Sequence, residues 1–168
     1  FIQRDFLMER VKRVFKARPQ QEALRVVLSS STDSLSPDQT DLGTVTRTGN
    51  VYESLVAFDR NLKIIPALAL SWGNLTPTLW EFKLRQEVVF HDGTPFSALN
   101  VVERFEQARA AQEPELTSSL KTIREIREVD SYTIQIETTA PDPLLLAKLT
   151  KLFIARPGSG GTGPYRVR

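Results

Sequence analysis

Residues 64–104 read IIPALALSWGNLTPTLWEFKLRQEVVFHDGTPFSALNVVER, and this stretch decides the fold of the chain. From Trp80 to Arg85, apolar side chains alternate with charged ones. This is the period-two pattern of a strand with one buried face. The centre of the stretch therefore predicts a half-buried antiparallel strand.

The second half of the stretch predicts a short strand, a tight turn and a capped helix. Val88 to Phe90 is apolar and is followed by Asp92 and Gly93, a pair that tolerates the positive φ of a tight turn. Ser97 stands where a helix N-cap is expected. Behind it, apolar residues recur at helical spacing: Ala98, Val101, Val102, Phe105 and Ala108.

Other parts of the chain predict further elements. We expect a helix over residues 45–56, a turn over 59–61 and a short strand over 63–65. The spacing of apolar residues from Leu116 to Ile126 fits either a helix or the first arm of a hairpin, whereas residues 132–137 alternate as a strand does. Asp142 and Pro143 predict the start of a helix that continues to Leu152.

The N-terminal segment is strongly basic. Residues 1–18 hold six basic and two acidic side chains, a net charge of +4, while the whole chain carries +2, so the remainder carries −2. An amphipathic helix ending at Pro19 can pack on the domain, or residues 1–18 can contact an anionic membrane surface. No aromatic interleaving or reading module accompanies the charge, so nucleic-acid binding is not expected.

Nothing in the sequence supports catalysis. The 168 residues contain no cysteine and only one histidine, His91, which is expected to hold a turn. Phosphate-binding loops, nucleophile elbows and favoured carboxylate pairs are also missing from the sequence. We therefore predict no enzyme activity, no catalytic residue, no metal site and no cofactor.

Three segments carry a resemblance to a known family. These are the block quoted above, the segment GNVYESLVAFD at residues 49–59 and the segment GTGPYRV at residues 161–167. Together they resemble family 5 of the bacterial extracellular solute-binding proteins, the peptide and nickel receptors of ATP-binding-cassette importers. The resemblance runs from about Leu24 to Val167, and it favours the hairpin over 122–137 with a short helix before it.

The resemblance implies a fold and a function. The fold is mixed α/β: part of one lobe of a type II periplasmic-binding-protein-like receptor, with a mixed sheet and flanking helices. The implied function is capture of a peptide or other small solute for a membrane permease by a monomeric, extracytoplasmic receptor, periplasmic or anchored as a lipoprotein. Two rivals remain: a membrane-tethered interaction module, and a receptor of the same fold for a sugar or a metal chelate.

The resemblance also suggests domain bounds. We expect a basic helix over residues 1–19, the lobe over 20–156 and a return segment of the same lobe over 161–168. Between them, residues 157–160 resemble an engineered flexible linker in place of a longer family segment. Natural shortening is the alternative. No run of roughly 18–20 apolar residues is present, and we expect the chain to begin after a removed export segment.

Candidate ligand-binding residues come from two places. In the family, residues just ahead of the Tyr-Glu motif lie near the ligand cleft, which here implies Thr44, Val45, Thr46 and Arg47. Ser30 and Ser31 follow a predicted first strand over residues 23–29, where hydroxyl groups could bond a ligand.

Overall fold

The computed structural model defines residues 37–38 and 48–166. The predicted helix over 1–18 and strand over 23–29 lie outside these residues. A helical stretch over 48–51 comes first among the longer defined part. The named elements then follow in this order: β1 (Val56–Phe58), β2 (Ile64–Pro66), β3 (Ala69–Thr76), β4 (Leu79–Leu84), α3 (Ala98–Ala110), α4 (Pro114–Leu120), β5 (Ile123–Asp130), β6 (Thr133–Thr138) and α5 (Leu145–Leu149).

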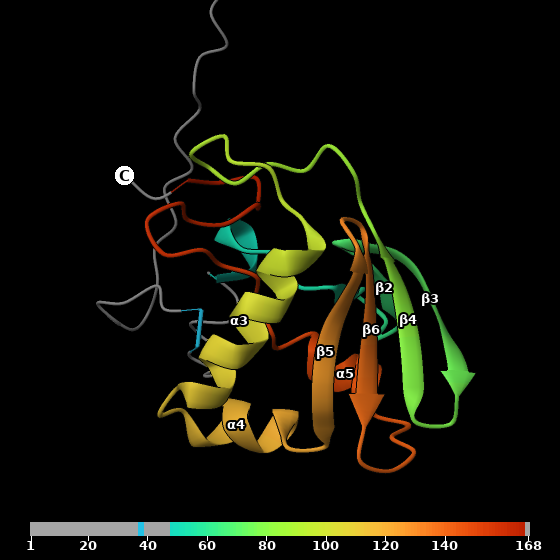
Figure 1. Cartoon of the computed structure of the whole chain (residues 1–168). Coiled ribbons are helices and arrows are strands. Elements are labelled where there is room, and N and C mark those ends of the chain that lie inside the picture. The colour runs from blue at the N-terminus through green and yellow to red at the C-terminus, as the bar shows by residue number, and fades with distance from the viewer. Residues whose placement is uncertain (1–36, 39–47, 167–168) are drawn as a thin grey trace, which may run out of the picture. The chain divides into compact units, whose positions relative to one another are not determined.

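Four of the strands form one antiparallel sheet in the order β3-β4-β6-β5, and β1 pairs with β2 in a separate hairpin (Figure 1). The central strand behaves as the alternation predicts. Phe82 is fully buried and lies opposite Ile134 of β6, while Lys83, the next residue, is exposed and lies opposite Thr133. The predicted half-buried strand is confirmed.

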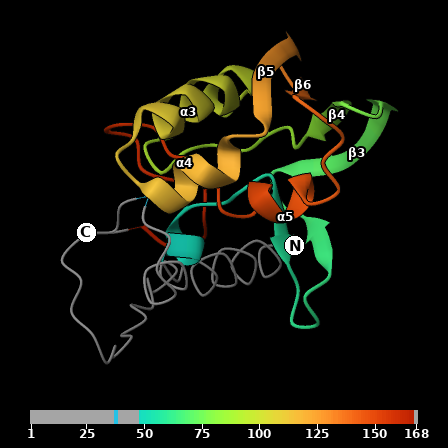
Figure 2. The same ribbon diagram turned by 90° about the horizontal axis from the view of Figure 1, so that it is seen from below.

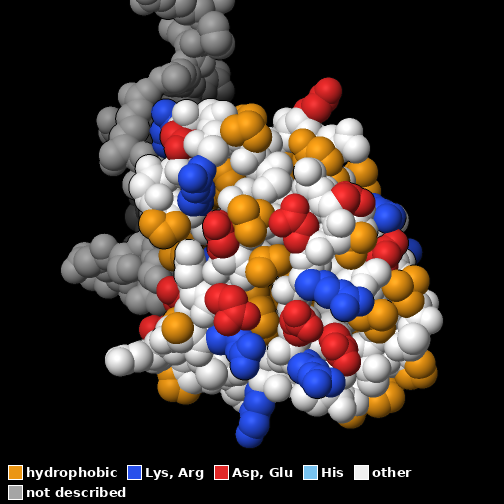
Figure 3. All heavy atoms as spheres, viewed as in Figure 1, with side chains coloured by type: hydrophobic (Ala, Val, Ile, Leu, Met, Phe, Trp, Pro, Cys, Tyr) orange, Lys and Arg blue, Asp and Glu red, His pale blue; other side chains and the backbone are white. Residues whose placement is uncertain are grey.

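The outer face of the sheet carries a ladder of polar side chains. Glu81 accepts from Lys83 at 3.0 Å and from the Gln135 amide at 3.0 Å. Arg127 donates to the Gln135 carbonyl oxygen at 2.6 Å, which extends the ladder from β4 to β5. Figure 3 shows acidic and basic side chains interspersed over this region. The charges on this face largely satisfy one another, as expected of a solvated surface.

The other face of the sheet packs against the helices and contains the core. Fully buried Phe82, Ile134 and Ile136 share one cluster with Val101 and Phe105 of α3. Figure 2 shows α3 and α4 side by side, next to the β5 edge of the sheet. The mixed α/β fold predicted from the sequence is confirmed, but the sheet is not mixed, because every pair of named strands among the described residues is antiparallel.

Helix α3 begins where the sequence predicts. Ser97 is extended at the N-cap, and its backbone N–H donates to Oδ1 of Asn100 at 2.9 Å, which satisfies one unpaired group at the helix start. The turn before it has Gly93 at φ 88°, and Asp92 accepts from the Thr94 N–H at 2.8 Å. The strand, turn and capped helix of the central stretch are therefore confirmed, with the short strand reduced to a bridge between Val89 and Pro95.

The prediction of a helix over residues 45–56 is wrong at its C-terminal end. Helical structure stops at residue 51, and Val56 enters β1, where it lies opposite Pro66. The backbone carbonyl groups of this segment accept hydrogen bonds from distant residues instead. Leu68 N–H donates to Ser54 O at 3.1 Å, and Ala69 N–H donates to Leu55 O at 2.8 Å. Tertiary pairing outweighs the weak helical spacing of the apolar residues.

The helix predicted from Asp142 to Leu152 is shorter, and Asp142 does not cap it. Leu144 occupies the N-cap position, while Asp142 accepts from the Leu144 N–H at 3.0 Å in a turn that precedes the helix. At the other end the chain leaves the helix so that Ile154 N–H can donate to Glu53 O at 2.8 Å. A long-range backbone pair therefore ends this helix early.

Candidate functional site

The residues predicted to contact ligand lie outside the defined residues. They are Ser30, Ser31, Thr44, Val45, Thr46 and Arg47. The candidate site is therefore built from segments that the defined part of the chain brings together. Three of them, residues 50–53, 90–95 and 154–165, contain motifs that are far apart in the sequence.

The first and last of these segments are joined by backbone hydrogen bonds. Gly163 N–H donates to Val51 O at 2.9 Å, and Tyr165 N–H donates to Asn50 O at 3.1 Å. The side chain of Glu53 also accepts from Arg85 at 2.8 Å, which connects the junction to the end of β4. Residues 161–165 therefore lie against the carbonyl groups of residues 50–51, at the end of the helical stretch over 48–51.

Two glycines allow this close approach. A Cβ atom on Gly161 would lie 2.1 Å from Val51 O, and one on Gly163 would lie 2.7 Å from Asn50 O. Both distances are shorter than van der Waals contact, so only glycine fits without a shift of backbone. The glycines of this motif thus serve packing.

His91 joins the middle segment to the last one. Gly161 N–H donates to Nδ1 of His91 at 3.3 Å, and Nε2 lies 2.8 Å from Gly163 O. Because Nδ1 accepts, we assign the proton to Nε2, which then donates to Gly163 O. The backbone N–H of His91 donates to Gly161 O at 2.9 Å as well. This single histidine therefore bonds the glycine segment through its ring and its backbone.

The segment predicted as a flexible linker forms a turn against the His91–Asp92 loop. Ser159 N–H donates to Arg156 O at 3.1 Å, and Gly158 and Gly160 have φ values of 79° and 75°, a region that favours glycine. Hydrogen bonds from the Ser159 hydroxyl and from Thr94 lower the pKa of Asp92 to about 2. The origin of this segment, natural or engineered, stays a prediction; Ser159 is buried in the turn, while Pro157 and Gly158 are exposed.

A hollow of about 310 Å³ lies on this junction and opens to solvent. Its lining includes Tyr52, His91, Asp92, Ser159 and Arg166. Burial raises the pKa of the Tyr52 hydroxyl, and the charge of Arg104 opposes that rise only in part. The residues around the hollow therefore include a carboxylate, a guanidinium and a phenol.

A larger hollow of about 720 Å³ lies at the turn between α3 and α4, lined by residues such as Arg109, Thr117 and Lys121. It shares no lining residue with the junction. Its volume is the larger of the two. Among the described residues, however, no hydrogen bond or ion pair joins two of the polar side chains that line it. We take the junction as the candidate site because three motifs meet there.

Arg104 is a buried charge that the motifs did not single out. Its side chain is 2% exposed, and Nη2 lies 2.6 Å from Oδ1 of Asp38. Its Nε donates to Phe153 O at 2.8 Å, and Nη2 also donates to Pro37 O at 3.3 Å. One signal was available in the sequence, since Arg104 follows Val101 by three residues and so lies on the apolar stripe of α3.

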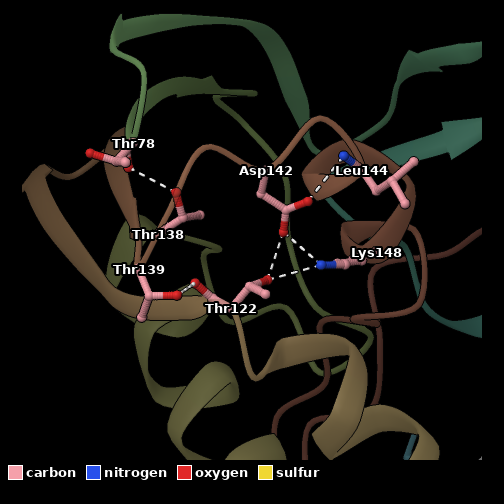
Figure 4. A network of polar contacts seen from close by, with 7 residues as sticks. All are labelled: Thr78, Thr122, Thr138, Thr139, Asp142, Leu144 and Lys148. Atoms are coloured by element: carbon pink, nitrogen blue, oxygen red, sulfur yellow. Dashed lines mark hydrogen bonds and ion pairs between the residues drawn. The ribbon is translucent and has the colours of Figure 1, made fainter.

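A half-buried polar network anchors α5 (Figure 4). The Thr122 hydroxyl donates to Oδ2 of Asp142 at 2.6 Å and accepts from Lys148 Nζ at 2.9 Å, while Lys148 also pairs with Asp142 at 2.6 Å. Burial raises the pKa of the Asp142 carboxyl, but hydrogen bonds from Lys148 and Thr122 outweigh it and hold the pKa below its usual value. Each of the three groups is satisfied by the other two, so the network is structural.

Neither metal ligation nor membrane spanning is indicated in the defined part of the chain. Within residues 37–38 and 48–166, no three His, Asp or Glu side chains gather as metal ligands would. Over the same residues, every helix is too short or too polar to cross a bilayer.

Comparison with known proteins identifies similar sequences and folds. The family model described as "Bacterial extracellular solute-binding proteins, family 5 Middle" matches residues 63–168. The uncharacterised protein YhjP of Bacillus subtilis is 25% identical over 124 residues, which are 70% of this chain and 22% of YhjP. The glutathione-binding protein GsiB of Pectobacterium atrosepticum is 29% identical over 160 residues, 84% of this chain and 31% of GsiB.

Solved structures give the same picture. The murein tripeptide binding protein MppA of Escherichia coli superposes with a TM-score of 0.73 at 21% identity, covering 80% of this chain and 33% of MppA. The periplasmic binding protein DppA of Helicobacter pylori, solved with the peptide STSA, has a TM-score of 0.67 at 27% identity, covering 79% of this chain and 34% of DppA. The chain thus spans between about a fifth and a third of the proteins that it matches.

Proposed function

Because this chain belongs to family 5 of the bacterial extracellular solute-binding proteins, we propose that it forms part of the receptor lobe of an ATP-binding-cassette importer. The observation that carries the proposal is the match over residues 63–168, joined to a fold shared with MppA and DppA. In this role the protein binds and releases a solute without changing it covalently. Its partners are the solute and a membrane permease.

We propose a peptide as the solute class, the class named for three of the relatives reported above. DppA was solved with a bound peptide, and GsiB is named for glutathione, itself a peptide. The hollow at the junction is compatible with this class, because its lining includes a carboxylate and a guanidinium, groups that pair with the charged ends of a short peptide. A sugar or a metal chelate is the alternative for a receptor of this fold.

The described residues provide one wall of a binding site. The hollow opens to solvent, and a small ligand gains affinity when protein buries most of its surface. We therefore propose that a second lobe supplies the opposite wall and that closure of the two signals the permease. We also propose that the receptor works outside the cytoplasm, periplasmic or anchored as a lipoprotein, and acts as a monomer.

Isothermal titration calorimetry tests this proposal with three probes: trialanine, the tetrapeptide STSA and glutathione. The product of the complete reading frame should bind at least one of them with micromolar affinity, while the 168-residue chain should bind none. Micromolar binding by the short chain would contradict the two-wall account. Binding of a sugar or of nickel-histidine by the complete protein, with no peptide bound, would contradict the peptide class.

A further inference from the structure

The hairpin of β1 and β2 ends in a turn that exposes apolar side chains. Leu62 in the turn is 79% exposed, and Phe58 and Ile65 on the two strands are 45% and 37% exposed. Figure 2 shows this hairpin, in blue-green, projecting from the rest of the fold. We propose that the hairpin tip, residues 58–65, is a membrane-contact loop that enters the headgroup region of an anionic bilayer.

Leu62 has a backbone conformation that leucine seldom adopts. Its φ is 60°, in the left-handed region that favours glycine and asparagine. Its N–H donates to Asp59 O at 3.1 Å, so Leu62 closes a β-turn at the position where a hairpin of this kind usually has glycine. A strained and exposed leucine adds little to the stability of the fold itself. Strain of this kind, together with exposed apolar surface, indicates a site used for binding.

The backbone of the turn is already paired. Oδ1 of Asp59 accepts from the N–H groups of Asn61 and Lys63, at 2.8 and 2.9 Å. The Asp59 N–H donates to Lys63 O at 2.9 Å. With the bond from Leu62, four of the five N–H groups of residues 59–63 are paired within the turn. Unpaired backbone groups are costly in lipid, so this turn can leave water at a low cost.

Apolar side chains lie on both faces of the hairpin. Phe58 lies opposite Ile64, whereas Ile65 pairs with the residue before Phe58. Because successive residues of a strand point to opposite faces, Phe58 and Ile65 lie on different faces. A protein partner would cover one face, whereas lipid surrounds a tip that enters it on every side. The arrangement therefore favours a bilayer over a second protein.

Two cations lie beside these apolar residues. Arg60 and Lys63 are exposed, and no ion pair in the described part of the chain involves either of them. With Asp59 as the only acidic residue, residues 58–65 have a net charge of +1 (two basic residues minus one acidic). Basic side chains next to exposed apolar ones suit anionic headgroups and the hydrocarbon boundary beneath them. Anionic lipid is therefore the partner class.

Co-sedimentation of the 168-residue chain with lipid vesicles tests this contact. Vesicles of phosphatidylcholine with an equal share of phosphatidylglycerol are compared with vesicles of phosphatidylcholine alone. Leu62→Asn should lower the partition coefficient on the mixed vesicles at least about fivefold, because one leucine fewer leaves water. Leu75→Asn removes a leucine that is 55% exposed on β3 and should change the coefficient by less than about twofold. Arg60→Gln combined with Lys63→Gln should lower binding to mixed vesicles at least about fivefold and hardly change binding to neutral ones.

A stability measurement separates lost contact from lost folding. Asparagine tolerates a positive φ better than leucine does, so Leu62→Asn should leave the urea midpoint unchanged or raise it. Weaker vesicle binding by a variant that is at least as stable as wild type then reports on the contact itself.

A fluorescent label locates the contact within the chain. The sequence has no cysteine, so Leu62→Cys and Leu75→Cys each take a single label of the environment-sensitive fluorophore NBD. The label at position 62 should brighten at least about twofold on mixed vesicles, while the label at position 75 should not change. Binding through the basic residues 1–18 alone would leave both labels in water and would overturn the inference.

Other results would also overturn it. These are no binding to mixed vesicles, equal binding by wild type and Leu62→Asn, or a dimer in sedimentation velocity that Leu62→Asn dissociates. The last result would make a second copy of the chain the occupant of the tip. The inference does not rest on the proposed receptor function, so failure of peptide binding leaves it standing, and absence of vesicle contact leaves the receptor proposal standing.

Discussion

Neutralising Asp38 should destabilise the chain because it leaves the guanidinium of Arg104 without its counter-charge. The Arg104 side chain is 2% exposed and sits 2.6 Å from the carboxylate. In Asp38→Asn the side chain keeps its shape and one acceptor oxygen, so the charge is the main property lost. The substitution therefore measures the ion pair with little change in packing.

The expected magnitude follows from the burial of the two partners. A hydrogen bond to a charged group contributes about 1.5–3 kcal/mol, and breaking a fully buried ion pair costs about 3–5 kcal/mol. Asp38 is 30% exposed, and the carbonyl oxygens of Phe153 and Pro37 still accept from Arg104, so the smaller cost applies. We expect a loss of about 2–3 kcal/mol of unfolding free energy.

Urea denaturation followed by tryptophan fluorescence measures this loss. With a slope of about 1.5 kcal/mol per molar urea, the midpoint should fall by about 1.3–2 M. Glu128→Gln removes a carboxylate from an exposed position of β5 and is the matched control, expected to change stability by less than about 0.5 kcal/mol. The double variant of Asp38→Asn with Arg104→Met should cost less than the sum of the two single changes, because the stranded charge is removed. A cost for Asp38→Asn no larger than that of the control would refute the reasoning.

Three further outcomes are expected. Gly161→Ala should lower the unfolding free energy by about 2 kcal/mol or more, because its Cβ would lie 2.1 Å from a backbone oxygen, whereas Gly73→Ala, with no atom within 4 Å, should have little effect. Phe82→Ala should cost about 3–5 kcal/mol by leaving a cavity at a fully buried site, and Val129→Ala, at an exposed one, should cost less than about 0.5 kcal/mol. Asp92 has a folded-state pKa of about 2 against a usual 3.8, so its contribution is complete above pH 3.8 and is lost as the pH falls through 2. The stability difference between wild type and Asp92→Asn should accordingly shrink over that window, and a constant difference would contradict the assignment.

Local patterns were sufficient for much of the fold. Alternation from Trp80 to Arg85 and the N-cap at Ser97 predicted β4 and α3, and both are present. The hairpin of β5 and β6 was ambiguous until the resemblance decided it. These elements are set by neighbours along the chain, which is why the sequence alone is informative about them.

Elements that depend on distant backbone were missed. No strand was predicted over residues 69–76, because Ser71, Gly73 and Asn74 interrupt the alternation, yet β3 pairs with β4 along most of its length. Pairing through the backbone does not require a side-chain pattern, and an edge strand needs only one partner. The same reason explains the loss of helix near Val56 and after Leu149.

The glycine segment shows what composition leaves open. Residues 157–160 resemble a linker because glycine gives an isolated chain freedom, and this stays a prediction. Freedom and close approach both come from the missing Cβ, and the sequence cannot say which one is used until the neighbour is known. Here the neighbours are Val51, more than a hundred residues earlier in the sequence, and His91, about seventy residues earlier. Only the three-dimensional structure therefore shows that these glycines allow a close approach.

The burial of Arg104 was predictable from the sequence, but its partners were not. An arginine three residues after Val101 and one residue before Phe105 lies on the buried side of α3, and a buried guanidinium must find acceptors. The sequence thus implies that partners exist but leaves open which of many carboxylates and carbonyls they are. In the structure the acceptors are Asp38, Pro37 and Phe153, which lie before and after α3 in the sequence. Arg104 therefore joins residues 37–38 to Phe153, at the start of the segment that leads into residues 158–163, and its loss should affect both.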